Sequence, residues 1–387
     1  MKKFNEKYLY LYRFIGGCMP IFGFYQLLFL ENGMSITGVT ILIAIWNVTV
    51  VLAEIPTGII ADKFNRRNLL VFSSLIQGTG FLIWFFASGF WTFALGFILW
   101  GIAEAMVSGA ETSLIYDNLK FDQKVDKFSE VFGKAEFCGN IGVIVAIISA
   151  GILISFVSPA TMALTSSIIC LVNAGVALGI REKNYYCESQ TDGELEGTLK
   201  DAISFFKTNT LAFLFGVFLV IFASMGSYLE EFDAFIAIDF DRGNIWIAVV
   251  LAIRFAFVAV GDLLAPWFEK KIKSNSQIIL ISLIGYAILG AFAFIWHLFA
   301  LVLFGLSFML LAIAGVLTTQ KLQSQVKEEG RATIMSFVGL SQALTMIFVT
   351  LVFGALAGVF TIRQVYFVFI AFGIGGGLVM LPLIRRW

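Results

Sequence analysis

Residue types that build metal and haem sites are scarce in this sequence of 387 residues, which contains one histidine, His297, and four cysteines. The cysteines, Cys18, Cys138, Cys170 and Cys187, lack the paired spacing that marks a disulfide framework or a zinc site. A Gly-x-x-x-x-Gly-Lys motif, the loop that cradles nucleotide phosphates, is also absent. We therefore expect no metal, no cofactor and no direct use of ATP.

Charged residues are few as well: they make up 13% of the chain, and 26 basic residues balance 26 acidic ones. Without net charge or a basic tail, the sequence predicts no nucleic-acid partner. Hydrophobic residues, in contrast, make up 59% of the chain, include 42 phenylalanines and give a mean hydropathy of +0.91. Soluble domains contain about 45–50% apolar residues, so the composition predicts a protein that lies in a lipid bilayer.

The apolar residues form stretches long enough to cross a membrane, which needs about 20 residues in a helix. The first stretch is too long for the apolar part of a cleaved signal, and no small-x-small site follows it. Twelve spans are predicted, at residues 8–30, 37–60, 68–88, 91–116, 129–154, 158–180, 210–237, 244–266, 276–296, 298–319, 332–358 and 362–384.

Lysine and arginine collect in every second loop between these spans. If the N-terminus is inside, the cytoplasmic segments hold 21 of the 26 basic residues, and the external loops hold Arg242 and Arg363. Because cytoplasmic loops are the ones that accumulate basic residues, we expect both termini in the cytoplasm. The expected location is the cytoplasmic membrane of a bacterium, as a multi-pass protein.

One long polar segment, at 181–208, separates the first six spans from the last six. We expect three parts: an N-terminal bundle at 1–185, a cytoplasmic linker at 186–208 and a C-terminal bundle at 209–387. Apolar residues recur at helical spacing in the linker, from Leu195 and Leu199 to Phe206, which predicts a short amphipathic helix. This helix either lies on the cytoplasmic membrane face or is an ordinary packed linker helix.

A charged turn joins the second and third spans, where Glu54-x-Pro56 is followed by Gly58, Ala61, Asp62, Arg66 and Arg67. This run resembles the signature cytoplasmic loop of the major facilitator superfamily of secondary transporters. The second half repeats it weakly, with Gly261-Asp262 and later Lys270 at the matching turn. The resemblance implies an all-α membrane protein, not an enzyme, with twelve transmembrane helices in two pseudo-symmetric six-helix bundles that alternately expose a midplane cavity.

The same resemblance assigns a conformational latch to this loop. It implies an ion-paired cluster of Asp62, Arg66 and Asp117, with Asp62 facing the N-terminus of the eleventh span near Gly330, where a helix dipole favours a carboxylate. Gly58 is then small enough for the second helix to approach its partner closely. The alternative for Arg66 is a role in membrane orientation alone.

Ionisable residues inside the spans are the candidates for a proton or substrate site, because an unpaired charge there is costly. Glu104, Ser108 and Glu111 share one face of the fourth span, and Asp117 points roughly opposite. We expect Glu104 near the cavity, where desolvation disfavours a charged carboxyl. The alternative is a structural ion pair, for which Arg254 in the eighth span is a candidate partner.

An acidic cluster lies near the outer end of the seventh span, where Glu230 and Asp233 share a helical face. These residues either attract a cationic substrate or couple to protons, or they are simply solvated at the outer interface. Asn47 in the second span and Gln26 in the first are further cavity candidates.

Among the branches of this superfamily, the residues look most like bacterial drug and metabolite exporters that exchange protons for amphipathic molecules. That likeness implies proton-coupled efflux of an amphipathic or cationic compound by a monomer. The fifth span keeps Gly139 and Gly142 but lacks the proline of the antiporter motif, so proton-coupled uptake of a small polar nutrient remains the alternative. For uptake we expect more Asn, Gln and Trp at the cavity than Gln26, Asn47 and Asn140 supply.

Overall fold

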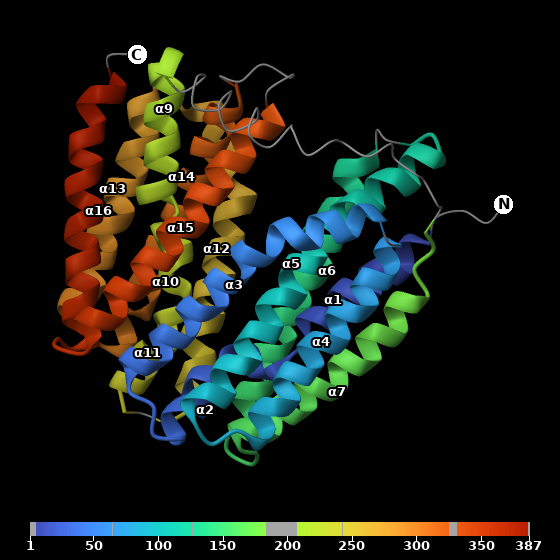
Figure 1. Ribbon diagram of the computed structural model, residues 1–387. Coiled ribbons are helices and arrows are strands. Elements are labelled where there is room, and N and C mark those ends of the chain that lie inside the picture. Colours follow the sequence, from blue (N-terminus) through green and yellow to red (C-terminus); the bar gives the residue numbers. More distant parts are fainter. Residues whose placement is uncertain are drawn as a thin grey trace. The chain divides into compact units, whose positions relative to one another are not determined.

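The computed structural model describes residues 5–63, 65–124, 127–182, 207–241, 243–324 and 331–385, and in these ranges it contains helices and no strands (Figure 1). An apolar chain forms helices in lipid because a helix satisfies its own backbone hydrogen bonds without water. The predicted all-α class is confirmed. The predicted linker helix at 195–206 lies outside the described residues.

The chain divides near residue 190 into two compact units, and Asn244–Val249 groups with the first of them. The described helices of the N-terminal unit are α1 (Glu6–Gly17), η1 (Pro20–Gly23), α2 (Tyr25–Glu31), α3 (Ile36–Lys63), α4 (Arg66–Phe86), α5 (Phe90–Phe121), α6 (Phe128–Leu153) and α7 (Pro159–Leu178). Helix α4 packs against α5 and α7, α3 packs against α5, and α1 packs against α6.

The described helices of the C-terminal unit are α9 (Thr210–Val217), η3 (Phe218–Ala223), α10 (Met225–Leu229), η4 (Glu230–Phe232), α11 (Asp233–Asp239), α12 (Ile245–Lys271), α13 (Asn275–Ile295), η5 (Leu298–Ala300), α14 (Leu301–Ser324), α15 (Arg331–Ala357) and α16 (Ile362–Arg385). Helix α13 packs against both α14 and α16.

Eleven helical segments in the described ranges are long and apolar enough to cross a membrane. The remaining predicted span, at 8–30, is interrupted: α1 has 12 residues and α2 has 7, and the short helix η1 lies between them. Pro20 begins η1, and proline cannot donate the backbone hydrogen bond that would continue α1. The eleven segments and this interrupted one account for the twelve predicted spans.

The seventh span was predicted as one continuous helix, and the structure corrects this. Between α9 and α10 the chain forms a π-helical segment, η3, and a 3-10 turn, η4, precedes α11. Two tyrosine side chains donate hydrogen bonds to backbone carbonyl groups of the π-helical segment. Tyr228 Oη donates to Val220 O at 2.7 Å, and Tyr286 Oη donates to Phe222 O at 2.6 Å. Irregular backbone at membrane depth is tolerated where other groups satisfy it in this way.

Helices α1 and α6 touch through glycines. A Cβ atom added at Gly17 would overlap the carbonyl oxygen of Gly139, and one added at Gly142 would overlap that of Phe14. Small residues permit such close approach of membrane helices. This contact brings the side chains of the two helices, including Arg13 and Glu136, within reach of each other.

Candidate functional site

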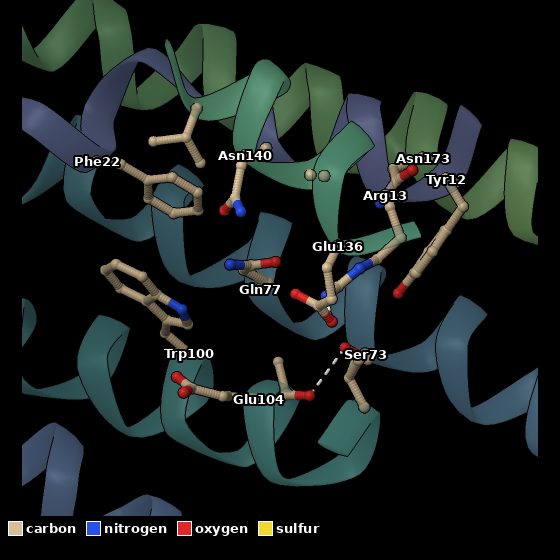
Figure 2. A pocket seen from close by; sticks show the side chains of 16 residues that line it. Tyr12, Arg13, Phe22, Ser73, Gln77, Trp100, Glu104, Glu136, Asn140 and Asn173 are labelled. Atoms are coloured by element: carbon tan, nitrogen blue, oxygen red, sulfur yellow. Dashed lines mark hydrogen bonds and ion pairs between the residues drawn. The ribbon is translucent and has the colours of Figure 1, made fainter. Parts of the chain in front are cut away.

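A pocket of about 290 Å³ lies inside the N-terminal unit, lined by residues of α1, η1, α4, α5, α6 and α7. Figure 2 shows two kinds of side chain around it: aromatic rings on one side, with Phe22 and Trp100, and charged groups on the other, with Arg13 and Glu136. A cavity with apolar walls and a few convergent polar groups is the usual form of a small-molecule site.

The aromatic wall is a stack of rings from three elements. The Phe22 and Trp100 rings are 5.1 Å apart at an interplanar angle of 16°, and the Trp46 ring lies 4.9 Å from that of Trp100. Rings packed in this way fix one another's orientation. The pocket therefore has a rigid apolar wall at Phe22 and Trp100.

Glu104, on α5, lines the pocket as predicted. Its Oε2 accepts a hydrogen bond of 3.0 Å from the Trp46 indole Nε1, which orients the carboxyl group beside the aromatic wall. The residue as a whole is exposed, because it faces the empty volume of the pocket. Glu104 is thus positioned to contact a ligand directly.

Three amide side chains add hydrogen-bonding groups to the pocket: Gln77 from α4, Asn140 from α6 and Asn173 from α7. Asn173 is buried, and its Oδ1 has no hydrogen-bond partner among the described residues. A buried polar atom without a partner is costly, so this oxygen is available to a donor group of a ligand. Only Asn140 was a predicted cavity residue; Gln77 and Asn173 were missed.

A charged cluster lies at one end of the pocket. Arg13 Nη2 donates to Glu136 Oε1, and Arg13 Nε lies 3.3 Å from Glu111 Oε1. The Glu136 side chain is 44% exposed and lines the pocket, whereas that of Glu111 is 5% exposed and lies behind it. The alternative in which Arg254 is the partner of these carboxylates differs from the structure: Arg13 lies beside Glu111, Glu104 accepts from Trp46, and Arg254 pairs with Asp233. The sequence signal for Arg13 was its charge inside an apolar span.

Arg254 belongs to a second charged cluster, within the C-terminal unit. Its Nη1 donates to Asp233 Oδ2 at 2.7 Å, its Nη2 donates to Gly226 O, and its guanidinium lies 4.1 Å from the centre of the Phe308 ring. Glu230 Oε2 is 3.7 Å from Arg254 Nη2. Both acidic residues therefore face one arginine, which is 2% exposed.

Asp233 is fully buried, and its second oxygen, Oδ1, accepts a hydrogen bond of 2.9 Å from Tyr366 Oη. The alternative that Asp233 is simply solvated at the outer interface is therefore wrong. Asn47 is not among the pocket residues: its Nδ2 donates to Ile43 O of its own helix at 3.0 Å.

In the predicted latch, Arg66 Nη1 forms an ion pair with Asp117 Oδ2. Glu182 completes this region, because its carboxylate accepts backbone N–H groups of Arg66 and Arg67 at 2.8 and 3.1 Å and so caps the start of α4. Gly58 and Asp62 lie in helix α3, but the structure does not describe their side-chain surroundings. The predicted contact near Gly330 also lies outside the described residues.

Among the described residues, no group of three or more His, Cys, Asp or Glu side chains is arranged to hold a metal ion. Eleven of the described helical segments are long and apolar enough to cross a membrane, and helices of the N-terminal unit surround a pocket with charged, amide and aromatic walls. The sequence profile of the Major Facilitator Superfamily matches residues 10–344. The chain belongs to this superfamily and is a multi-pass transporter that works by alternating access.

Similar proteins extend over nearly the whole chain. The uncharacterized transporter BU466 of Buchnera aphidicola subsp. Acyrthosiphon pisum (strain APS) is 22% identical over 348 residues, which cover 88% of this chain and 86% of that protein. The crystal structure of the nucleoside transporter NupG matches with a TM-score of 0.80 at 16% identity and covers 98% of this chain and 99% of that one. A D-xylose-proton symporter matches with a TM-score of 0.72 at 13% identity, over 97% and 94% of the two chains.

Proposed function

We propose that the protein imports a small polar solute with a ring, together with protons, and binds it in the pocket of the N-terminal unit. The observation that carries this proposal is the lining of one cavity by Gln77, Asn140, Asn173 and the Trp100 ring. Uptake requires more Asn, Gln and Trp at the cavity than Gln26, Asn47 and Asn140 supply. A solute held by a ring face and by several hydrogen bonds fits this lining.

Glu104 supplies the charged contact in this scheme. The Trp46 indole N–H orients the carboxyl group, which stays exposed to the pocket. There it accepts a hydrogen bond from a hydroxyl or N–H group of the solute. Nucleosides and xylose, the solutes in the names of two transporters of the same fold, are polar ring molecules with such donors. They are therefore the first probes to test.

Efflux of an amphipathic cation is the second candidate, and the charge of the pocket favours it. Glu104 and Glu136 line the cavity against one cationic residue, Arg13. An acidic excess in the cavity attracts an organic cation through Coulomb interactions. In this case protons enter the cell as the cation leaves.

Accumulation assays in bacterial cells that express the protein separate the two candidates. The probes are radiolabelled uridine, D-xylose and the cation tetraphenylphosphonium, each with and without a protonophore. Uptake predicts protonophore-sensitive accumulation of uridine or xylose above the level of cells without the protein. Lower accumulation of tetraphenylphosphonium with no gain of uridine or xylose contradicts uptake and supports efflux.

Matched variants locate the binding site in the same assay. Asn173→Leu removes the unpartnered amide of the pocket, whereas Asn47→Leu removes an amide that bonds its own helix outside the pocket. We expect roughly a 5- to 150-fold loss of transport for Asn173→Leu, in line with about 1–3 kcal/mol for a lost buried hydrogen bond, and little change for Asn47→Leu. Equal losses in both variants contradict a site in this pocket.

We further propose that the protein lies in a bacterial cytoplasmic membrane as a monomer with both termini inside, on the distribution of its basic loops. Fusions to the C-terminus test this orientation: green fluorescent protein is expected to fluoresce and alkaline phosphatase to be inactive. An active phosphatase fusion contradicts it.

The latch role of Gly58, Asp62, Arg66 and Asp117 is likewise a proposal, and the Arg66–Asp117 ion pair supports it. Asp117→Asn is expected to shift the balance between inward-open and outward-open states, measured by the rate at which engineered cysteines on the two sides react with a maleimide. Unchanged rates on both sides contradict the latch.

A further inference from the structure

The charged cluster behind the pocket joins three helices through one cation. Arg13 on α1 lies between Glu111 on α5 and Glu136 on α6, and Figure 2 shows the Arg13 and Glu136 side chains directed toward each other. If both carboxyl groups are ionised, the cluster carries one negative charge in excess. An uncompensated charge inside a membrane protein is costly, and binding one proton removes it.

The two carboxyl groups are not equivalent. Glu136 is hydrogen-bonded to Arg13 and 44% exposed in the pocket, so its charge is compensated both by the guanidinium and by water. Glu111 is 5% exposed, and its Oε1 has no hydrogen-bond partner among the described residues although Arg13 Nε is 3.3 Å away. The side chain with the poorer compensation is the one that takes the proton.

We propose that Glu111 is the site at which the coupling proton binds, and that Arg13 controls its release. While Arg13 pairs with Glu136, Glu111 is neutral and holds the proton. When Arg13 turns to pair with the Glu111 carboxylate, the proton leaves to water in the pocket and Glu136 remains as a solvated anion. This assignment rests on the proposed proton coupling, and it separates the proton site from Glu104, which serves the solute.

Other groups around Glu111 support this division. Tyr12 on α1 lies near the same carboxyl and is buried, so it remains a neutral phenol beside it. Glu54 on α3 lies near Glu104, and its charge is felt there rather than at Glu111. Among the described residues, Arg13 is the cation beside Glu111, with its Nε 3.3 Å from Glu111 Oε1, so the protonation of Glu111 depends on where this guanidinium points.

Infrared difference spectroscopy tests the site without any knowledge of the solute. The full-length protein in lipid nanodiscs is titrated, and the C=O stretching band of protonated carboxyl groups is recorded. We expect Glu111→Gln to remove one protonated carboxyl per molecule from the wild-type spectrum. Arg13→Gln is expected to leave this band in place, because Glu111 stays neutral and Glu136 is solvated in the pocket. Glu104→Gln is the control for a pocket carboxyl outside the cluster and is expected to leave the Glu111 band in place. Size-exclusion profiles and circular dichroism verify that each variant is folded.

A band that is unchanged in Glu111→Gln overturns the proposal. Glu136→Gln tests the control by Arg13: Arg13 then pairs with Glu111, and the band is expected to disappear. A band that persists in Glu136→Gln at the wild-type area overturns the control of Glu111 by Arg13.

Transport in proteoliposomes provides the second readout, with uridine, xylose or tetraphenylphosphonium as the probe. For one coupled proton, a gradient of one pH unit supports about a tenfold accumulation, which Glu111→Gln is expected to abolish while exchange of labelled for unlabelled probe continues. If the infrared result holds but no probe is transported, the proposed solute class fails and the proton site stands. If a probe is transported and Glu111→Gln still accumulates it tenfold, the proton site fails and the proposed function stands.

Discussion

The two units each contain an arginine that faces two carboxylates, but the surroundings of the two clusters differ. In the C-terminal unit, Arg254 and Asp233 are buried, and carbonyl, phenol and aromatic groups of their surroundings satisfy them. In the N-terminal unit, the cluster around Arg13 borders a cavity and leaves a buried carboxylate oxygen without a hydrogen bond among the described residues. Because a cavity reaches the N-terminal cluster and its bonding is incomplete, we propose it as the functional one of the two.

The largest effect is expected from breaking the buried C-terminal pair. Arg254→Leu leaves Asp233 buried without its cation, and loss of one partner of a buried pair costs about 3–5 kcal/mol. The double variant Arg254→Leu with Asp233→Leu removes both charges and is expected to recover most of this loss. Thermal unfolding in detergent measures both proteins; equal destabilisation in the single and double variants contradicts a mainly structural pair.

A smaller loss is expected when the contact that builds the N-terminal cluster is disturbed. Gly142→Leu forces a side chain into the backbone of α1, and such overpacking costs about 1–3 kcal/mol. Gly133→Leu on the same helix is the matched control, because a Cβ atom there meets open space. The comparison fails if the two variants unfold at the same temperature.

Arg13→Gln is expected to destabilise the protein by only about 1–2 kcal/mol, the cost of a lost hydrogen-bonded charge contact. Glu136 reaches the water of the pocket, and Glu111 is already neutral in the proposed scheme, so neither carboxyl is left as a buried bare charge. The unfolding temperature of this variant is compared with that of Arg254→Gln, which is expected to unfold at a lower temperature. A larger decrease of the unfolding temperature in Arg13→Gln contradicts the contrast between the two clusters.

The smallest effect concerns the cap at the start of α4. Glu182→Gln weakens the contact of a carboxylate with two backbone N–H groups, and charge at a helix N-terminus contributes about 0.3–1 kcal/mol. Hydrogen exchange at the first turn of α4 is expected to become faster while exchange in the middle of α4 stays unchanged. Unaltered exchange at Arg66 and Arg67 contradicts the capping role.

The spans were predictable because hydropathy depends on short stretches of sequence, and the loop motif led to Arg66 and Asp117. Glu104 was predictable too, since its depth and face follow from its position on one helix. The Arg13 cluster was not. Arg13 and Glu136 are 123 residues apart, and their contact depends on the glycine contact between α1 and α6, which no local pattern of hydropathy reveals.

The partner of Arg254 was missed for a different reason. The prediction treated the seventh span as a regular helix at the outer interface, whereas η3 and η4 interrupt it and place Asp233 in the interior. Helical spacing alone cannot show where a helix changes its hydrogen-bonding pattern, because the carbonyl acceptors of that segment are satisfied by Tyr228 and by Tyr286 of another helix.

The π-helical segment fixes the register of everything that follows it in the seventh span. If η3 rewound into a regular α-helix, one residue would move into the next turn, and the remainder of the span would rotate by about 100° around its axis. Such a rotation would carry Asp233 away from Arg254 and Tyr366. The phenol groups of Tyr228 and Tyr286 thus determine, from a distance, which acidic side chain the arginine meets.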